Sequence, residues 1–162
     1  ESWFNLSLLT TKEKFTYEEG GIVKTTAWQR RPTDARVVSS LFFQDDLPSN
    51  KTYRMSMMYT FVTGLPFYFL ESNRYEQTGN RIPAYQRVDI GFQKLLIMPG
   101  METKHKLFKN IETAFVSIDV FNLLANNNII SYNIFKDFAN NYYGVPNYLT
   151  GRRLNVRLYI GF

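Results

Sequence analysis

The chain has 162 residues, of which 44% are hydrophobic and 17% aromatic, whereas only 20% are charged. This composition excludes an intrinsically disordered chain, because that class is poor in aromatic residues. With no cysteine and a single histidine, His105, the sequence excludes disulfide frameworks, thiolate zinc sites and cysteine nucleophiles. We therefore expect neither a cofactor nor a resident metal, and no apolar run is long enough for a membrane-spanning helix.

The net charge of +5 and the isoelectric point near 9.4 are compatible with a nucleic-acid partner. However, the basic residues are spread singly along the chain, with adjacent pairs only at Arg30–Arg31 and Arg152–Arg153. No basic stripe is visible in the sequence, so we expect no nucleic-acid partner.

Apolar and polar residues alternate in six windows, which is the period-two pattern of strands with two different faces. The third window has tyrosine, methionine and phenylalanine at odd positions, and the sixth has leucine, valine, isoleucine and phenylalanine at even positions. The pattern predicts six β-strands in an all-β fold. In chain order the windows are 2–10, 36–44, 51–63, 86–96, 111–122 and 152–162.

The connections between these windows alternate in length. Long connections precede the second, fourth and sixth windows, whereas 45–50 and 97–110 are shorter. Asp45 and Asp46 are interpreted as turn residues before Pro48 rather than as a catalytic carboxylate pair, because neighbours on a strand point to opposite faces. Long and short connections in alternation are typical of a transmembrane β-barrel, whose extracellular loops are long and periplasmic turns short.

The two faces of the predicted strands support the barrel. The apolar faces carry no charge in mid-strand, place Tyr53 and Tyr59 toward strand ends, and leave Lys94 at an end where its stem can reach the interface. The polar faces predict lumen-facing residues, and on periodicity alone a soluble β-sandwich or lipocalin-like barrel remains an alternative. The predicted lumen-facing residues are Arg54, Arg87, Asp89, Gln93, Asp119, Arg153, Asn155 and Arg157.

Four stretches of the sequence resemble TonB-dependent outer-membrane receptors of Gram-negative bacteria, and together they span the last two thirds of the chain. The closing stretch, 146–162, resembles the final barrel strand of that family, in which Leu158, Ile160 and Phe162 look like the outer-membrane assembly signal. The other three stretches are Gly64-Leu65-Pro66-Phe67, Tyr85-Gln86-Arg87-Val88-Asp89-Ile90-Gly91-Phe92 and Val120-Phe121-Asn122-Leu123-Leu124.

The resemblance implies a barrel of about 22 strands with a separate plug domain. Six strands cannot close a transmembrane barrel, for which about eight are needed, so we expect the C-terminal part of a larger receptor. That expectation also accounts for the lack of a signal-peptide pattern at Glu1. Alternatives are a small independent outer-membrane barrel or adhesin, and a soluble ligand-binding β-barrel.

The resemblance further implies a nutrient importer of the cell outer membrane rather than an enzyme. Its expected partners are the remaining barrel strands, the plug, outer-membrane lipid, the TonB complex indirectly, and a surface lipoprotein over the loops. Arg87 and Asp89 are interpreted as a lumenal pair rather than a solute site, and Arg153 and Arg157 as plug contacts rather than ligand contacts.

Aromatic residues gather in the long connections, where they either stack on a ligand or form the small apolar clusters that keep loops folded. Residues 126–132 are interpreted as a turn and a strand extension that adds no further membrane crossing. The candidate ligand contacts are Phe67, Tyr68, Tyr75, Tyr142 and Tyr143.

Overall fold

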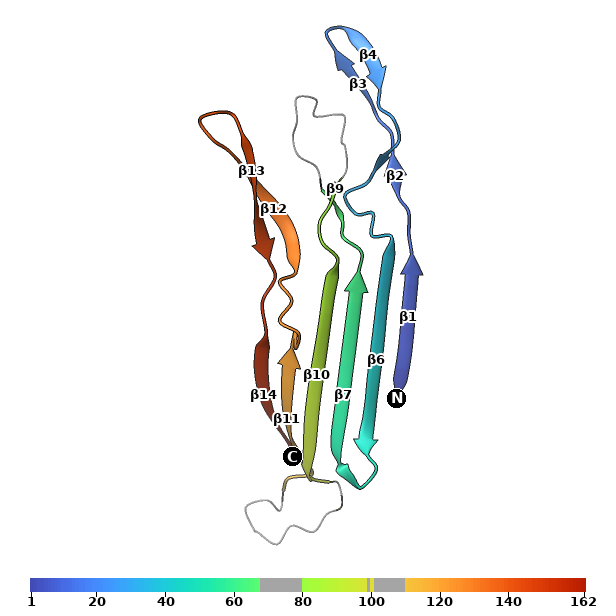
Figure 1. The fold of residues 1–162 in the computed structure, drawn as a ribbon. Coiled ribbons are helices and arrows are strands. Elements are labelled where there is room, and N and C mark those ends of the chain that lie inside the picture. Colours follow the sequence, from blue (N-terminus) through green and yellow to red (C-terminus); the bar gives the residue numbers. More distant parts are fainter. Residues whose placement is uncertain (68–79, 99, 101–109) are drawn as a thin grey trace.

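The computed structural model describes residues 1–67, 80–98, 100 and 110–162, and all regular structure within them is β. Six strands form one antiparallel sheet in chain order (Figure 1), which confirms the predicted number of strands and the all-β class. Their bounds match the six predicted windows to within three residues. The strands are β1 (Ser2–Leu8), β6 (Val37–Leu47), β7 (Asn50–Val62), β10 (Tyr85–Ile97), β11 (Thr113–Phe121) and β14 (Arg153–Gly161).

Short two-stranded hairpins occupy the long connections, all beyond the same end of the sheet (Figure 1). The hairpin that follows β11 confirms that residues 129–132 extend a connection without adding a strand to the main sheet. That hairpin pairs β12 (Ile129–Lys136) with β13 (Tyr142–Tyr148). The other pairings lie between β1 and β6 and between β7 and β10. They join β2 (Lys12–Glu13) with β5 (Gln29–Arg30), β3 (Thr16–Glu19) with β4 (Ile22–Thr25), and β8 (Pro66–Phe67) with β9 (Asn80–Arg81).

The turn between β6 and β7 is tighter than the sequence predicts. Asp45 and Asp46 belong to β6, so their interpretation as turn residues is wrong. The strand continues because Asp46 lies opposite Arg54 and accepts a hydrogen bond from its Nε at 2.7 Å, which adds a cross-strand ion pair to the backbone ladder. Asp45 points to the opposite face, and only Pro48 and Ser49 remain in the turn.

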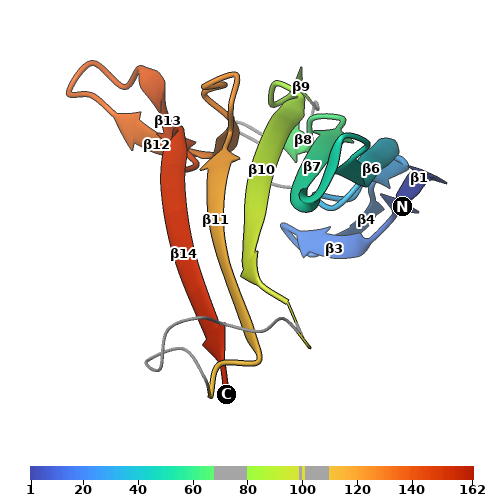
Figure 2. The same ribbon diagram turned by 90° about the horizontal axis from the view of Figure 1, so that it is seen from below.

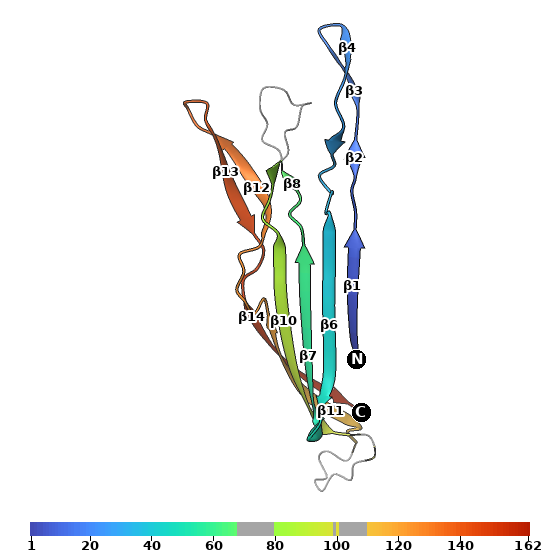
Figure 3. The same cartoon turned by 45° about the vertical axis from the view of Figure 1, so that its right-hand side comes forward.

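The six-stranded sheet is not closed into a barrel. Strands β1 and β14 each pair on one side only, and in Figure 2 the described chain forms a single curved layer with no second sheet over either face of the main one. Figure 3 shows β14 strongly inclined to β1 and β6, as the twist of antiparallel strands requires. Within the described ranges, Ala114 is the only buried hydrophobic residue, at 5% exposure.

A sheet with so little buried apolar surface has no hydrophobic core of its own on either side. No helix in the described part of the chain is long and apolar enough to cross a membrane.

Candidate functional site

One face of the sheet is apolar across all six strands. The strand register sets Phe92 opposite Met55 on one side and Ile118 on the other, and sets Ile118 opposite Val156. Phe92, Ile118 and Val156 are 54%, 45% and 62% exposed, so this row is uncovered in mid-sheet. We call this surface the apolar face; by register it includes Phe4, Leu6 and Leu8 of β1 and Leu41 and Phe43 of β6.

The apolar face carries charge only near one end of the strands. Among the strand residues at the positions of this face, Asp45, Lys51 and Lys94 are charged. Asp45 and Lys51 lie close to the short turn in sequence, and Lys94 lies close to it in the sheet, opposite Tyr53. The Lys94 ammonium lies 5.0 Å from the centre of the Tyr53 ring, a cation–π contact that holds the charge at the margin of the face.

The opposite face, which we call the polar face, holds all eight predicted lumen-facing residues. The register joins Arg54, Gln93 and Arg157 through Ser117 in one row, and joins Gly91, Asp119 and Asn155 in the next. A β-carbon at Gly91 would lie 2.6 Å from Ser56 Oγ and 2.8 Å from Asp119 Oδ1, so this glycine makes room for the polar groups beside it. The remaining three residues are Arg87, Asp89 and Arg153.

Ion pairs organise the polar face. Arg87 Nε donates to both carboxylate oxygens of Asp89, at 2.7 and 3.0 Å, and the backbone N–H of Asn122 donates to the same carboxylate at 2.8 Å. Asp119 Oδ2 accepts from Asn155 Nδ2 at 3.3 Å and lies 3.9 Å from the guanidinium of Arg157. Arg87 and Asp89 therefore form an ion pair, and their orientation toward a lumen stays a prediction.

A cavity of about 440 Å³ opens on the polar face near the hairpin end of β10, β11 and β14. Arg87, Phe121, Arg153 and Asn155 line it together with the chain at 150–151. The Arg87 guanidinium carbon lies 5.4 Å from the centre of the Phe121 ring, and the register sets Arg153 directly opposite Phe121. Two arginines therefore flank one aromatic ring.

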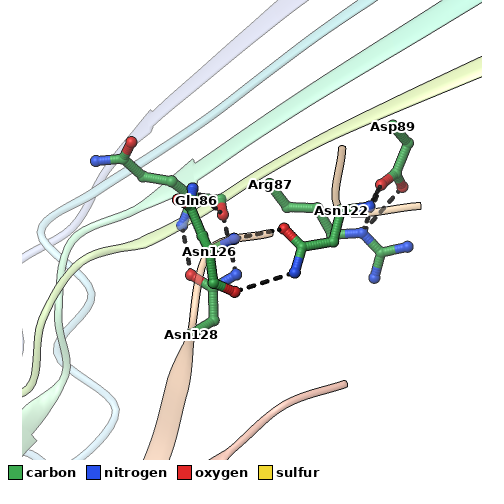
Figure 4. Close-up of polar contacts among 6 residues, drawn as sticks. All are labelled: Gln86, Arg87, Asp89, Asn122, Asn126 and Asn128. Atoms are coloured by element: carbon green, nitrogen blue, oxygen red, sulfur yellow. Dashed lines mark hydrogen bonds and ion pairs between the residues drawn. The ribbon is translucent and has the colours of Figure 1, made fainter. Parts of the chain in front are cut away.

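An asparagine-rich turn follows β11 and binds the edge of β10 (Figure 4). Asn122, with a φ of 52°, turns the chain away from the sheet, and its side chain exchanges hydrogen bonds with the backbone of Asn126. Asn128 Nδ2 donates to the Gln86 carbonyl at 2.9 Å, and the Gln86 N–H donates to Asn128 Oδ1 at 3.0 Å. The Asn128 side-chain amide thus pairs with the backbone of Gln86, at a position of β10 that the β11 ladder does not reach.

A buried carboxylate ties the first two long connections together. Asp34 is fully buried and accepts from the backbone N–H of Thr11 at 2.7 Å and from Arg81, whose Nη1 also donates to the Gly64 carbonyl at 2.6 Å. The Thr11 N–H above all, and then Arg81, hold the pKa of Asp34 below its ordinary value, against the opposing effect of desolvation.

The loop aromatics mostly contact other loop residues. The Phe67 and Tyr132 rings lie 4.7 Å apart between centroids and join two hairpins, and the Tyr142 ring lies 5.3 Å from the Lys136 ammonium. Tyr143 donates to Asp137, whose pKa is lowered chiefly by the backbone N–H of Asn141. Outside the described residues lie Tyr68, Tyr75 and His105.

The residues of the predicted assembly signal lie on the last strand. Leu158 and Ile160 belong to the apolar face of β14, and both are exposed, as is Phe162 directly after the strand. The outer edge of β14 has no partner strand within the described chain.

Two of these contact networks are absent from the sequence interpretation. The density of asparagine at 122–128 is a visible signal for the turn, because asparagine favours positive φ and bonds to nearby backbone. The pairing of Asp34 with Arg81 has no local signal, since 47 positions separate the two residues.

No group of three or more side chains that could hold a metal occurs in the described ranges. Comparisons with protein-family models, curated proteins and solved structures find no match for this chain.

Proposed function

We propose that this chain is a section of the wall of a transmembrane β-barrel in a bacterial outer membrane. The observation that carries the proposal is a six-stranded antiparallel sheet with one continuous, exposed apolar face and an opposite polar face organised by ion pairs. Contiguous apolar surface of this extent marks a surface that a membrane or a partner covers.

Lipid fits the apolar face better than a partner protein sheet. Transmembrane β-strands need about 9–11 residues, and five of the six strands have 9 to 13. The middle of the face is free of charge, and the charged residues Asp45, Lys51 and Lys94 lie near one end, where headgroups and water would solvate them. All hairpins extend beyond the other end, as extracellular loops do in such barrels.

The open sheet supports membership of a larger barrel. Unpaired backbone groups at the outer edges of β1 and β14 would each cost several kcal/mol in hydrocarbon, so further strands must pair there. A small independent barrel would need at least two more strands from the long connections of this chain, but there β3–β4 and β12–β13 form separate two-stranded sheets. A soluble ligand-binding barrel would need closure of the main sheet, which is open. We therefore favour additional strands over both alternatives.

Because four of its stretches resemble TonB-dependent receptors, we further propose that the intact protein is a transporter and not an enzyme. Under this hypothesis the barrel encloses a plug domain, and the protein imports a scarce nutrient under the control of TonB. The chain would contribute lumen surface from the polar face, three loop hairpin groups and the terminal strand with Phe162.

Spin labels on neighbouring residues of β10 test the wall assignment. This chain has no cysteine of its own, so Phe92→Cys and the control Gln93→Cys give single labels on opposite faces of one strand in the intact protein in native membranes. We expect the label at 92 to collide with oxygen dissolved in lipid and the label at 93 to lack that lipid signature.

Equal lipid exposure at both positions would contradict the assignment, as would recovery of the folded protein from a detergent-free supernatant. The mass of the purified assembly distinguishes a section of a larger barrel from a small independent barrel. A closed barrel formed in detergent by this 19.1 kDa chain alone would favour the small independent barrel.

A further inference from the structure

The cavity beside Phe121 combines two cationic side chains with an aromatic floor. Arg87 reaches it from β10 and Arg153 from β14, and Phe121 lies between them on β11. Figure 4 shows the Nε side of the Arg87 guanidinium turned toward Asp89. We call this cavity the Arg87–Arg153 pocket.

The charges around the pocket do not balance. Three arginines, Arg87, Arg153 and Arg157, stand on this part of the polar face with two carboxylates, Asp89 and Asp119. Both carboxylates have partners: Asp89 binds Arg87 and a backbone N–H, and Asp119 binds Asn155 and lies near Arg157.

Arg153 is the cation left over. No hydrogen bond or ion pair joins it to any described residue, although it lines a cavity large enough for a small molecule or an incoming side chain. Guanidinium groups match the two oxygens of a carboxylate or phosphate in a planar fork, so an oxyanion is the ligand that the exposed, unpaired Arg153 side chain fits best.

We propose that the Arg87–Arg153 pocket binds an oxyanion of the carboxylate or phosphate type. Arg153 supplies the principal charge, Asn155 and residues 150–151 line the same cavity, and Phe121 forms an apolar floor beside the anion. The site rests on the proposed function in one respect: it faces the lumen only if the apolar face meets lipid.

An oxyanion in this position has two sources, a dissolved solute or a carboxylate from a part of the protein outside residues 1–162. Isothermal titration of the intact protein with inorganic phosphate, and separately with succinate, tests the solute. We expect binding that weakens about tenfold or more in Arg153→Gln, because a charge-assisted hydrogen bond is lost. The control Arg152→Gln removes the same charge one residue away, outside the cavity lining, and leaves binding unchanged.

Carbodiimide cross-linking tests the internal carboxylate. In the Arg153→Lys variant the new amine would form an amide, with loss of water, to any carboxylate it contacts, and mass spectrometry identifies the partner. A link to an aspartate or glutamate beyond residues 1–162, without the same link in Arg152→Lys, supports an internal occupant.

The proposal is overturned if neither anion binds and no such link forms, or if the only link joins position 153 to Asp89 or Asp119. The spin-label experiment tests the barrel-wall proposal independently of the oxyanion site. If phosphate binding depends on Arg153 but the label at 92 shows no contact with lipid, the oxyanion site is supported and the barrel-wall proposal is wrong.

Discussion

The Asn128 side chain completes the edge of β10, so its removal should loosen that edge locally. Asn128 is 6% exposed and makes two hydrogen bonds to the backbone of Gln86, one as donor and one as acceptor. In Asn128→Ala both are lost, while the backbone bonds of residue 128 to Asn126 and Leu149 remain. The Asn128→Ala variant therefore loses only the two side-chain hydrogen bonds to Gln86, and the backbone of the turn keeps its own bonds.

The expected cost follows from the two bonds. Each neutral hydrogen bond contributes about 0.5–1.5 kcal/mol net, which gives about 1–3 kcal/mol for opening the start of β10. Every 1.4 kcal/mol changes an equilibrium constant about tenfold. Asn128→Asp keeps the acceptor for the Gln86 N–H but sets a carboxylate oxygen against the Gln86 carbonyl, so it should be at least as destabilising at neutral pH.

Hydrogen exchange of peptides that contain the Gln86 amide measures this opening, because exchange of a protected amide reports the free energy of local unfolding. We expect exchange in Asn128→Ala to accelerate about five- to 140-fold at Gln86, with β7 little changed. Asn127→Ala is the matched control, because Asn127 is exposed and makes no side-chain hydrogen bond within the described chain. Unchanged exchange at Gln86, or equal acceleration in both variants, would refute the reasoning.

Three further outcomes follow from the structure. Gly64→Ala should lower the yield of folded protein, because its new β-carbon would lie 1.6 Å from the Ile82 carbonyl oxygen, whereas Gly151→Ala meets nothing within 4 Å; protease resistance compares the two. Because its pKa is lowered in the folded protein, ionised Asp34 stabilises the first long connection at pH values above 3.8, the ordinary aspartate pKa, and this stabilisation is lost as pH falls through the lower pKa of the folded state. Hydrogen exchange of residues 9–36 should therefore show less protection at pH 3 than at pH 6, and equal protection at both pH values would contradict this prediction. Phe162→Ala in the intact protein should reduce surface abundance more than thermal stability, and unchanged abundance would count against an assembly role.

The strands were predictable because their period-two pattern is strong on both faces. The alternation in β14 of leucine, valine and isoleucine with arginine and asparagine fixes which residues share a face without any knowledge of the partner strand. The end of β6 was less predictable, since Asp45 and Asp46 favour turns locally and only the pairing of Asp46 with Arg54 extends the strand.

The loop contacts depend on residues far apart in the sequence, and no local pattern reports them. Asp34 and Arg81 belong to different connections, and their pairing exists only because the β6–β7 strands bring the two connections to the same end of the sheet. The aromatic residues of the long connections indicate from sequence that apolar clusters could keep these loops folded, but they do not predict that the Phe67 ring contacts the Tyr132 ring. Their contacts account for both rings structurally, which weakens the case for Phe67 as a ligand contact.

The two faces of the sheet also differ in how they can be stabilised. On the polar face the chain supplies its own partners: Arg54 with Asp46, Arg87 with Asp89, and Arg157 with Asp119. On the apolar face Phe92, Ile118 and Val156 contact neighbours within one layer and nothing lies above them in the described chain, so their burial depends on the surroundings. Water outside the apolar face would leave the sheet without a hydrophobic contribution, whereas lipid would supply it while the ion pairs remain in a polar lumen. That asymmetry, present in β6, β7, β10, β11 and β14 of the main sheet, is the reason we propose a membrane barrel wall rather than a soluble domain.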